Sequence, residues 1–322
     1  MGRTSIGELT AEPGERRQGW VRVPGIDPAW EMPCVVVRGR DPGPTLAVTG
    51  GLHAAEYVSI EAVTRLARWV DPARLRGTLV SVLVVNTPGF FERSIYVNPR
   101  DGQNLGSALP GDANGTPSER VARFLLDEVI LGSDAYVDAH CGDMVEALIP
   151  FTLWPRATDP NVREKSAAMA RVYGLDRSLG MDLDKIPGRS YAEAAIRGVP
   201  AIVGEVGQQG ICDETFVLRH LRGLQNVMAH LGMVEPVGPP GPDPRALDGL
   251  AWTRTDVSAT YHPTVAVGDQ VAKGQKTGEL RDLFGETIQE LYSPADGDVV
   301  FQVTALAVKA GDPLLGIGVY SA

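Results

Sequence analysis

The stretch VTGGLHAAEYVSIEAV, residues 48–63, decides how this chain is interpreted. Its first residues end an apolar run, two glycines follow, and His53 and Glu56 then stand three residues apart. Gly50 and Gly51 permit a tight turn, because glycine adopts backbone conformations that other residues avoid. The pattern predicts a strand that ends at this turn and a helix that begins near Glu56, with two polar side chains at the junction.

The alternation of strand and helix patterns continues from about residue 45 to 230. Apolar, β-branched runs predict strands, and the amphipathic stretches between them predict helices. The predicted strands cover residues 45–50, 78–85, 135–139 and 200–205, and the predicted helices cover 56–70, 117–131, 160–173, 189–197 and 214–232. Because the strand runs are apolar on both faces, we expect an α/β fold with helices on both sides of a sheet.

The composition changes after residue 235. Residues 236–249 are rich in proline and glycine, which predicts an extended linker. Beyond it, short β-type runs alternate with turn sequences and no helical pattern is present. We therefore predict three parts, which are an α/β domain with the candidate site at 1–235, a linker at 236–249 and a small all-β domain at 250–322.

Composition and charge disfavour several classes of partner. The 322 residues include 30 Lys and Arg against 40 Asp and Glu, and the net charge of −10 disfavours nucleic acid and anionic membranes. No apolar run reaches the roughly 18 residues that cross a bilayer, and residues 1–17 lack the apolar core of a signal peptide. The three cysteines have no paired spacing. We expect a reduced, cytoplasmic protein with a small-molecule partner.

Two of the five histidines directly follow predicted strands. His53 follows the strand at 45–50, and His140 follows the strand at 135–139. Ligands of open α/β sheets bind beyond the carboxyl ends of the strands, where residues distant in sequence meet. We therefore expect His53, Glu56 and His140 to form one site. Two imidazoles and a carboxylate suit one Zn²⁺ per chain, with a fourth position left for water.

Hydrolysis at such a metal also needs a base and a cation near the developing oxyanion. Glu205 ends the last predicted strand and is the candidate for the base. Arg93 lies in the polar segment after the second predicted strand and is the candidate for the cation. The other histidines have simpler interpretations, with a packed or solvated helical position for His220 and His230 and a surface position for His262.

Taken in order, the motifs resemble those of the succinylglutamate desuccinylase/aspartoacylase family, a branch of the zinc carboxypeptidase-like hydrolases. GGLHAAE (50–56) is similar to that family's G-x-H-G-x-E, DAH (138–140) to its D-L-H, and GEVG (204–207) to the strand end with its catalytic glutamate. HCGDMVEALIPF (140–151) resembles a stretch of the predicted-deacylase subgroup. The resemblance implies a zinc-carboxypeptidase-like mixed sheet with helices on both faces and a small C-terminal β domain.

The resemblance also implies roles for single residues. It assigns zinc to the three ligands named above, and it makes Glu205 first the general base and then the general acid. Arg93 would polarise the scissile carbonyl. Asn104 stays in register with the family's D/N-L-N-R-x-F-P-G motif, and it is a candidate for substrate binding. Tyr191 stands where the family often places a tyrosine that contacts substrate, and helix packing is its alternative role.

The segment DGQNLGSALPG (101–111) departs from the family at the pair of residues that grips a substrate carboxylate. Gly106 and Ser107 stand where the family has asparagine and arginine. A substrate with a carboxylate would therefore need another cation. The candidates are Arg100, Arg189 and Arg197. This departure disfavours acetylaspartate and succinylglutamate as substrates.

These observations predict a zinc-dependent deacylase that hydrolyses an N-acyl amide of a small amine or amino-acid derivative. One alternative is a metallocarboxypeptidase, which uses the same zinc chemistry, although the lost pair would have held a peptide's terminal carboxylate. Another is a non-catalytic metal- or ligand-binding protein. Its β tail would then be a biotinyl/lipoyl-like carrier instead of a structural lid, with Lys273 and Lys276 in one turn. The sequence leaves open whether the chain forms a homo-oligomer.

Overall fold

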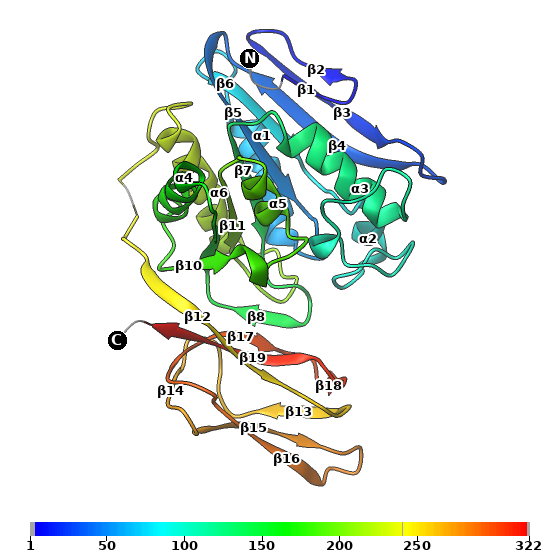
Figure 1. Ribbon diagram of the computed structural model, residues 1–322, viewed down its shortest axis with the longest axis vertical. Coiled ribbons are helices and arrows are strands. Elements are labelled where there is room, and N and C mark those ends of the chain that lie inside the picture. The colour runs from blue at the N-terminus through cyan, green and yellow to red at the C-terminus, as the bar shows by residue number, and fades with distance from the viewer. Residues whose placement is uncertain (1–3, 240, 321–322) are drawn as a thin grey trace.

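The computed structural model describes residues 4–239 and 241–320. An α/β body carries a β module at its C-terminal end, and strand β12 (Arg245–Arg254) leads from one to the other (Figure 1). This arrangement confirms the predicted fold class, a mixed α/β layer protein with a small all-β addition. Within the described residues, no helix has the length and the apolar composition that crossing a membrane would require.

The centre of the body is a mixed sheet in which β6, β5, β7 and β11 run parallel to one another in that order. Antiparallel β4 and β3 extend it on one side, and antiparallel β9 extends it on the other. The strands of the body are β3 (Glu15–Val23), β4 (Trp30–Arg38), β5 (Asp41–Gly50), β6 (Arg76–Val82), β7 (Ala135–His140), β9 (Phe151–Arg156), β10 (Arg177–Asp182) and β11 (Ala201–Glu205). A separate short hairpin joins β1 (Ser5–Ile6) and β2 (Leu9–Thr10).

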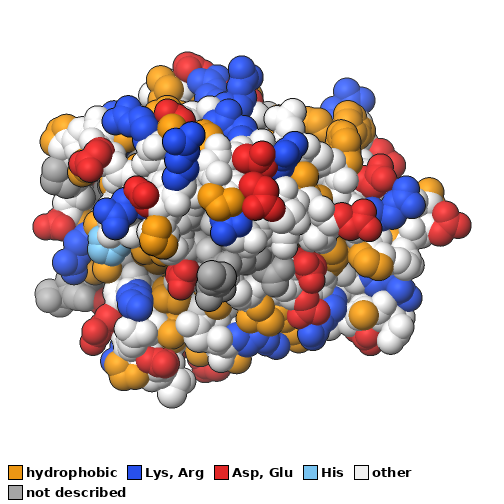
Figure 2. Space-filling model, turned by 90° about the horizontal axis from the view of Figure 1, so that it is seen from above, with side chains coloured by type: hydrophobic (Ala, Val, Ile, Leu, Met, Phe, Trp, Pro, Cys, Tyr) orange, Lys and Arg blue, Asp and Glu red, His pale blue; other side chains and the backbone are white. Residues whose placement is uncertain are grey.

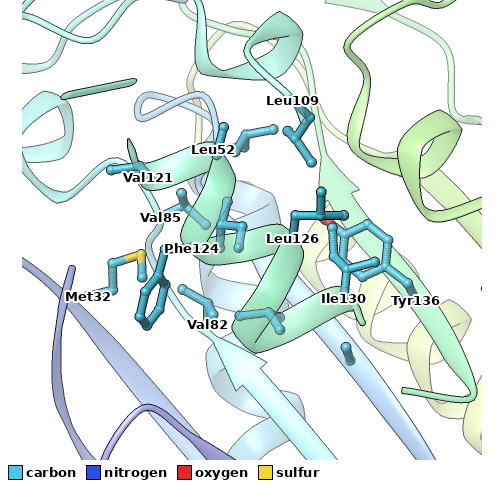
Figure 3. Close-up of a cluster of buried hydrophobic side chains, with 14 of the residues drawn as sticks. Met32, Leu52, Val82, Val85, Leu109, Val121, Phe124, Leu126, Ile130 and Tyr136 are labelled. Atoms are coloured by element: carbon cyan, nitrogen blue, oxygen red, sulfur yellow. The ribbon is translucent and has the colours of Figure 1, made fainter. Parts of the chain in front are cut away.

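Helices cover both faces of this sheet, as its doubly apolar strands predict. On β5, Ala47 packs in one hydrophobic cluster with α3 and α5, whereas Leu46 and Val48 pack in the other with α1, α4 and α6. Figure 3 shows the first cluster, in which Phe124, Leu126 and other side chains of α3 and the turn after it lie against the sheet. The helices are α1 (Tyr57–Trp69), α2 (Thr87–Glu92), α3 (Pro117–Leu125), α4 (Pro160–Val172), α5 (Ser190–Ile196) and α6 (Glu214–His230).

Sequence signals at the helix ends explain where several of these helices begin. Thr116 and Glu119 form a capping box at the start of α3, with a proline in the first turn. The side chains of Asp159 and Asp213 accept backbone hydrogen bonds at the starts of α4 and α6. The five predicted helices are therefore confirmed to within a few residues, and short α2 is an addition to them.

The β module is built on the same sheet instead of standing apart from it. β12 pairs in parallel with β10 through its first residues and antiparallel with β19 through the rest. The sheet then continues through β17 and β14, and β8 also pairs with β17. These strands are β8 (Glu146–Leu148), β14 (Gln270–Val271), β17 (Gly297–Val303) and β19 (Pro313–Tyr320). A smaller sheet holds β13 (Ala259–Pro263), β15 (Lys276–Arg281), β16 (Thr287–Tyr292) and β18 (Ala307–Val308).

The end of the predicted linker differs from the expectation. Residues 245–249 belong to β12, because residues 245–247 pair with β10 and Gly249 pairs with β19. The linker predicted at 236–249 therefore extends no further than residue 244.

Acidic and basic side chains are interspersed over the face of the molecule seen in Figure 2.

Candidate active site

The candidate site lies where three parallel strands end at the same edge of the sheet. The register pairs Gly50 of β5 with Ala139 of β7, and His140 of β7 with Glu205 of β11. Residues that follow one strand therefore lie beside residues that end the next, although Gly50 and Ala139 are 89 positions apart along the chain and His140 and Glu205 are 65 apart. Parallel pairing of these strands is what brings the predicted site residues together.

The turn after β5 gives the glycines of the GGLHAAE motif a structural reason. Gly51 has φ +65°, a conformation that suits glycine, and a Cβ there would lie 2.9 Å from the Ile60 side chain. The chain then presents His53 and reaches Glu56, which directly precedes α1. Ala54, which replaces a glycine of the family motif, is not among the described non-glycine residues with positive φ. Alanine is therefore tolerated there, as the sequence predicts.

His53, Glu56 and His140 converge around one carboxylate. The Nδ1 atom of His53 lies 2.7 Å from Glu56 Oε1, and the Nδ1 atom of His140 lies 3.0 Å from Glu56 Oε2. One donor atom from each of the three lies within 4.8 Å of the others, so the group could hold a metal ion. Two imidazole nitrogens and a carboxylate oxygen are a donor set that suits Zn²⁺. The residues present therefore fit the implied metal.

Each histidine is fixed through its other ring nitrogen. His53 Nε2 is 3.0 Å from Asn104 Oδ1, an oxygen that also accepts the Gly106 backbone N–H at 2.7 Å. His140 Nε2 is 3.2 Å from Asp138 Oδ2. Such partners orient metal-binding imidazoles and set their tautomers. The structure thus places Asn104, a candidate for substrate binding, in direct contact with a candidate metal ligand.

Asp138 is a site residue to which sequence reasoning gave no role. It is fully buried, accepts a hydrogen bond from Thr49 Oγ1 at 2.7 Å, and is also bonded by the Ser190 hydroxyl. Its position was visible in the motif DAH, because alternate residues of a strand share a face and Asp138 must point the same way as His140. The spacing of the motif therefore indicates that Asp138 lies beside His140.

The two glutamates of the site have opposite electrostatic surroundings. Burial favours the neutral form of Glu56, but His140 and His53 outweigh it and lower the pKa of this carboxyl to about 2. Burial raises the pKa of Glu205 to about 8, because the attraction of His140 does not compensate and Glu56 adds repulsion. The surroundings thus favour the ionised form of Glu56 and the protonated form of Glu205. This division fits one ligand and one proton carrier.

A family comparison decides what kind of protein carries this site. Residues 42–231 match the model of the succinylglutamate desuccinylase/aspartoacylase catalytic domain. The chain belongs to this family. It is accordingly a hydrolase of the deacylase class, and the family resemblance of its motifs is confirmed.

Individual relatives cover nearly the whole chain. Over 312 residues the chain is 26% identical to the N-alpha-acetyl-L-2,4-diaminobutyric acid deacetylase of Halomonas elongata, spanning 92% of this chain and 90% of that protein. A solved succinylglutamate desuccinylase/aspartoacylase from Rhodobacter sphaeroides is 25% identical, with a TM-score of 0.87 and coverage of 98% and 99% of the two chains. The product-bound ectoine utilization protein EutE of Ruegeria pomeroyi gives 22% identity, a TM-score of 0.89 and the same coverage. The family fold thus extends through the β module.

Arg93 and Tyr191 have no described hydrogen bond or ion pair with the three candidate ligands. Arg93 is exposed at the end of α2 with φ 57°, and none of the described ion pairs or side-chain hydrogen bonds involves its guanidinium. Tyr191 on α5 is only 5% exposed and packs in the hydrophobic cluster on that face of the sheet. Tyr191 therefore takes part in helix packing, which is its alternative role. The catalytic and substrate roles of both residues stay predictions.

Tyr96, to which sequence reasoning gave no role, also borders the site. The Tyr96 ring meets the His53 ring edge-on at 6.3 Å, and its backbone N–H donates to Asp143 Oδ2 at 3.0 Å. Glu146 Oε2 accepts the Asp143 N–H at 3.0 Å. Tyr96 has φ 58°, which is uncommon for a non-glycine residue. No local pattern announces this contact, because it depends on how two distant loops meet.

The remaining histidines agree with their simpler interpretations. His220 is fully buried on α6, and its Nδ1 lies 2.6 Å from the Tyr173 hydroxyl. His230 is exposed, and His262 is partly exposed on β13. In the β module, Lys276 pairs with two glutamates on β15 and β16, at 3.1 and 2.8 Å, and so differs from the free lysine that a carrier domain would display.

Proposed function

We propose that the chain is a zinc-dependent deacylase that releases a carboxylate and an amine from the N-acyl amide of a small amino-acid derivative. The observation that carries this proposal is the convergence of His53, Glu56 and His140 at one strand edge, with Glu205 on the adjacent strand. The Halomonas relative, named for its action on an acetylated diaminobutyrate, supports a small N-acetyl amino acid as the substrate class.

The proposed chemistry divides between the metal and the chain. A bound Zn²⁺ would supply Lewis acidity and would lower the pKa of water at the site. Glu205 would accept the proton of the attacking water and then deliver it to the leaving nitrogen. A group that both accepts and donates works best when its pKa lies near the working pH, and the raised pKa of Glu205 fits that role.

Other residues of the chain would hold this arrangement in place. Asn104 and Asp138 would fix the rings of His53 and His140 through hydrogen bonds to their outer nitrogens. Arg93 would meet the oxyanion as it forms, because a guanidinium placed near developing negative charge lowers the barrier. Arg93 is exposed, and no ion pair or side-chain hydrogen bond among the described residues engages its guanidinium, which supports this role.

Metal content provides the first test. We expect about one zinc per chain in the purified protein and markedly less in His140→Ala. A site with three protein ligands loses much of its affinity for zinc when one of those ligands is removed. His230→Ala, which changes an exposed histidine on α6, should keep the zinc of the unaltered protein. The readout is elemental analysis of all three proteins, beside hydrolysis of Nα-acetyl-L-2,4-diaminobutyrate. Absence of divalent metal from the unaltered protein, even after incubation with zinc, would refute the proposal.

A further inference from the structure

Arg189 is a cation that the structure brings beside the candidate metal ligands. It directly precedes α5, is partly buried, and donates from Nη1 to the Gly106 carbonyl oxygen at 3.1 Å. A Cβ placed on Gly106 would lie 3.2 Å from this Nη1, 3.0 Å from Asn104 Oδ1 and 2.7 Å from His53 Nε2. The guanidinium therefore reaches the space into which a side chain at position 106 would project.

The other two candidate cations are engaged elsewhere. Arg100 donates to the carbonyl oxygens of Pro28 and Ala29 at 2.6 and 3.2 Å, and its guanidinium lies 5.2 Å from the centre of the Trp30 ring. Arg197 forms an ion pair with Glu193, one turn before it on α5. Of the three arginines, only Arg189 lies next to a residue of the candidate site.

Most guanidinium N–H groups of Arg189 have no described hydrogen-bond partner. None of the described ion pairs includes it, and its described side-chain hydrogen bond goes to a neutral carbonyl through one of five guanidinium N–H groups. A partly buried positive charge is stabilised by an opposite charge. The planar guanidinium matches a carboxylate in two parallel hydrogen bonds, which gives both strength and orientation.

The position of Arg189 is set by close backbone contacts on both sides. Gly188 has φ +74°, and a Cβ there would lie 2.6 Å from the Ser107 carbonyl oxygen. Its own carbonyl oxygen accepts the Leu109 N–H at 3.2 Å. On the other side, the Ser190 hydroxyl donates to Asp138, the partner of His140. Arg189 is thus held between two segments that also orient the candidate ligands.

We infer that Arg189, whose guanidinium lies beside Gly106, binds the carboxylate of the substrate and so selects N-acyl α-amino acids with a free carboxylate. This inference rests on the proposed function. It gives the lost asparagine and arginine a substitute that comes from a different part of the chain. Arg189 is separated from Gly106 by 83 positions, so no local motif contains both residues.

The test compares ligands that differ only in charge. Calorimetry measures binding of N-acetyl-L-alanine, N-acetyl-L-aspartate and Nα-acetyl-L-2,4-diaminobutyrate, each as the free acid and as the primary α-carboxamide. The proteins are the full chain, Arg189→Gln, Arg189→Lys and the matched control Arg197→Gln from the same helix region. The full chain and Arg197→Gln should bind at least one acid about 10- to 100-fold more tightly than its carboxamide, as expected for a charged hydrogen bond.

Arg189→Gln should bring acid and carboxamide to within about twofold of each other, and Arg189→Lys should keep part of the preference, because it keeps the charge but loses the planar fork. In turnover, the loss for acids should lie mainly in KM and leave kcat nearly unchanged. Equal weakening of acid and carboxamide would make Arg189 a structural residue and overturn the inference. So would a preference that survives in Arg189→Gln, or failure of the full chain to bind any acid.

The inference and the proposed function fail in different ways. If the zinc-loaded chain binds the acids through Arg189 but hydrolyses none of them, the deacylase proposal fails and the carboxylate subsite remains. If it hydrolyses acids and carboxamides equally well, and Arg189→Gln does the same, the deacylase proposal stands and the assignment of Arg189 is wrong.

Discussion

His53 and His140 illustrate how single residues build the site from two layers of contacts. Each ring directs one nitrogen toward Glu56 and the other toward a polar partner, Asn104 for His53 and Asp138 for His140. The inner contacts follow from the motif spacing, whereas the outer contacts determine ring orientation. The register with a family motif predicts that Asn104 binds substrate. The structure shows its contact with His53, which the register alone does not predict.

At the same scale, Glu205→Gln tests the proton carrier. The amide cannot accept the proton of water, so we expect turnover of Nα-acetyl-L-2,4-diaminobutyrate to fall by about 10²- to 10⁴-fold. Zinc content should not change, because Glu205 is not among the three candidate ligands. Steady-state kinetics and elemental analysis measure the two effects, with the exposed Glu235→Gln as control. Near-normal turnover in a variant that still holds zinc would remove Glu205 from the mechanism.

His220 predicts how stability depends on pH. Burial lowers the pKa of this imidazole from 6.5 to about 4, and its Nδ1 is in contact with the Tyr173 hydroxyl. Below pH 6.5 the imidazole is protonated in the unfolded chain but stays neutral in the folded chain. The contribution of His220 to the unfolding free energy is therefore complete above pH 6.5 and is lost as the pH falls toward 4. Between pH 7 and 5 it amounts to about 2 kcal/mol of unfolding free energy.

Urea denaturation at pH 7 and 5 measures this effect, with His220→Gln as the comparison. The variant lacks the buried imidazole, so its unfolding free energy should depend less steeply on pH over this interval, while other titrating groups contribute equally to both proteins. Parallel pH dependence in the two proteins would show that His220 takes up its proton as readily in the folded chain as in the unfolded one.

At the scale of elements, the strand, turn and helix at 48–63 were predictable because each has a local cause. The apolar run gives β5, the glycines give the turn, and the periodic residues that follow give α1. The edge strand β3 lacked such a cause. β3 reads ERRQGWVRV, with charged side chains where an exposed edge strand meets solvent, so its strand character comes from pairing with β4 along its whole length.

Gly51→Ala tests whether the turn is a structural requirement. Alanine would be strained at φ +65° and its Cβ would meet Ile60 at 2.9 Å. The strain alone costs about 1–2 kcal/mol, and the contact adds about 1–3 kcal/mol. Gly232→Ala is a matched control, because Gly232 has φ +71° and open space around a Cβ. In urea denaturation Gly51→Ala should therefore lose clearly more unfolding free energy than Gly232→Ala, and equal losses would contradict the role of Ile60.

At the scale of the whole molecule, the β module is joined to the body by more than the chain connection. β12 pairs with β10 of the body, and β8 reaches out to β17 of the module (Figure 1). Arg177 of β10 forms an ion pair with Asp298 of β17 at 2.8 Å, and Tyr320 of β19 donates to the same carboxylate. The Asp298 side chain is only 4% exposed. The module is therefore anchored by a nearly buried polar contact.

Asp298→Asn tests this anchor. Burial raises the pKa of Asp298, but hydrogen bonds from Tyr320 and Arg177 outweigh it and lower the pKa below 3.8. The ionised carboxylate therefore stabilises the fold above pH 3.8, and this contribution is lost as the pH falls through the lower pKa of the folded state. At pH 7 the variant should lose about 1–3 kcal/mol of unfolding free energy.

Chemical denaturation measures that loss, and limited proteolysis between residues 236 and 244 reports loosening of the module. Asp256→Asn, at an exposed aspartate of the same module, is the control and should behave as the unaltered protein. If Asp298→Asn is as stable and as resistant to protease as this control, the ion pair does not hold the module in place.

The sequence by itself determined the features whose causes are local. Periodic apolar residues gave the α/β class and its helices, the change after residue 235 gave the β module, and the histidines and glutamates at strand ends gave the candidate ligands and base. Only the tertiary structure decided which partners orient those ligands and which cation borders them. The sequence does not distinguish between the three candidate arginines, Arg100, Arg189 and Arg197. Of these three, Arg189 alone contacts Gly106, because that contact depends on how two segments distant in sequence pack together.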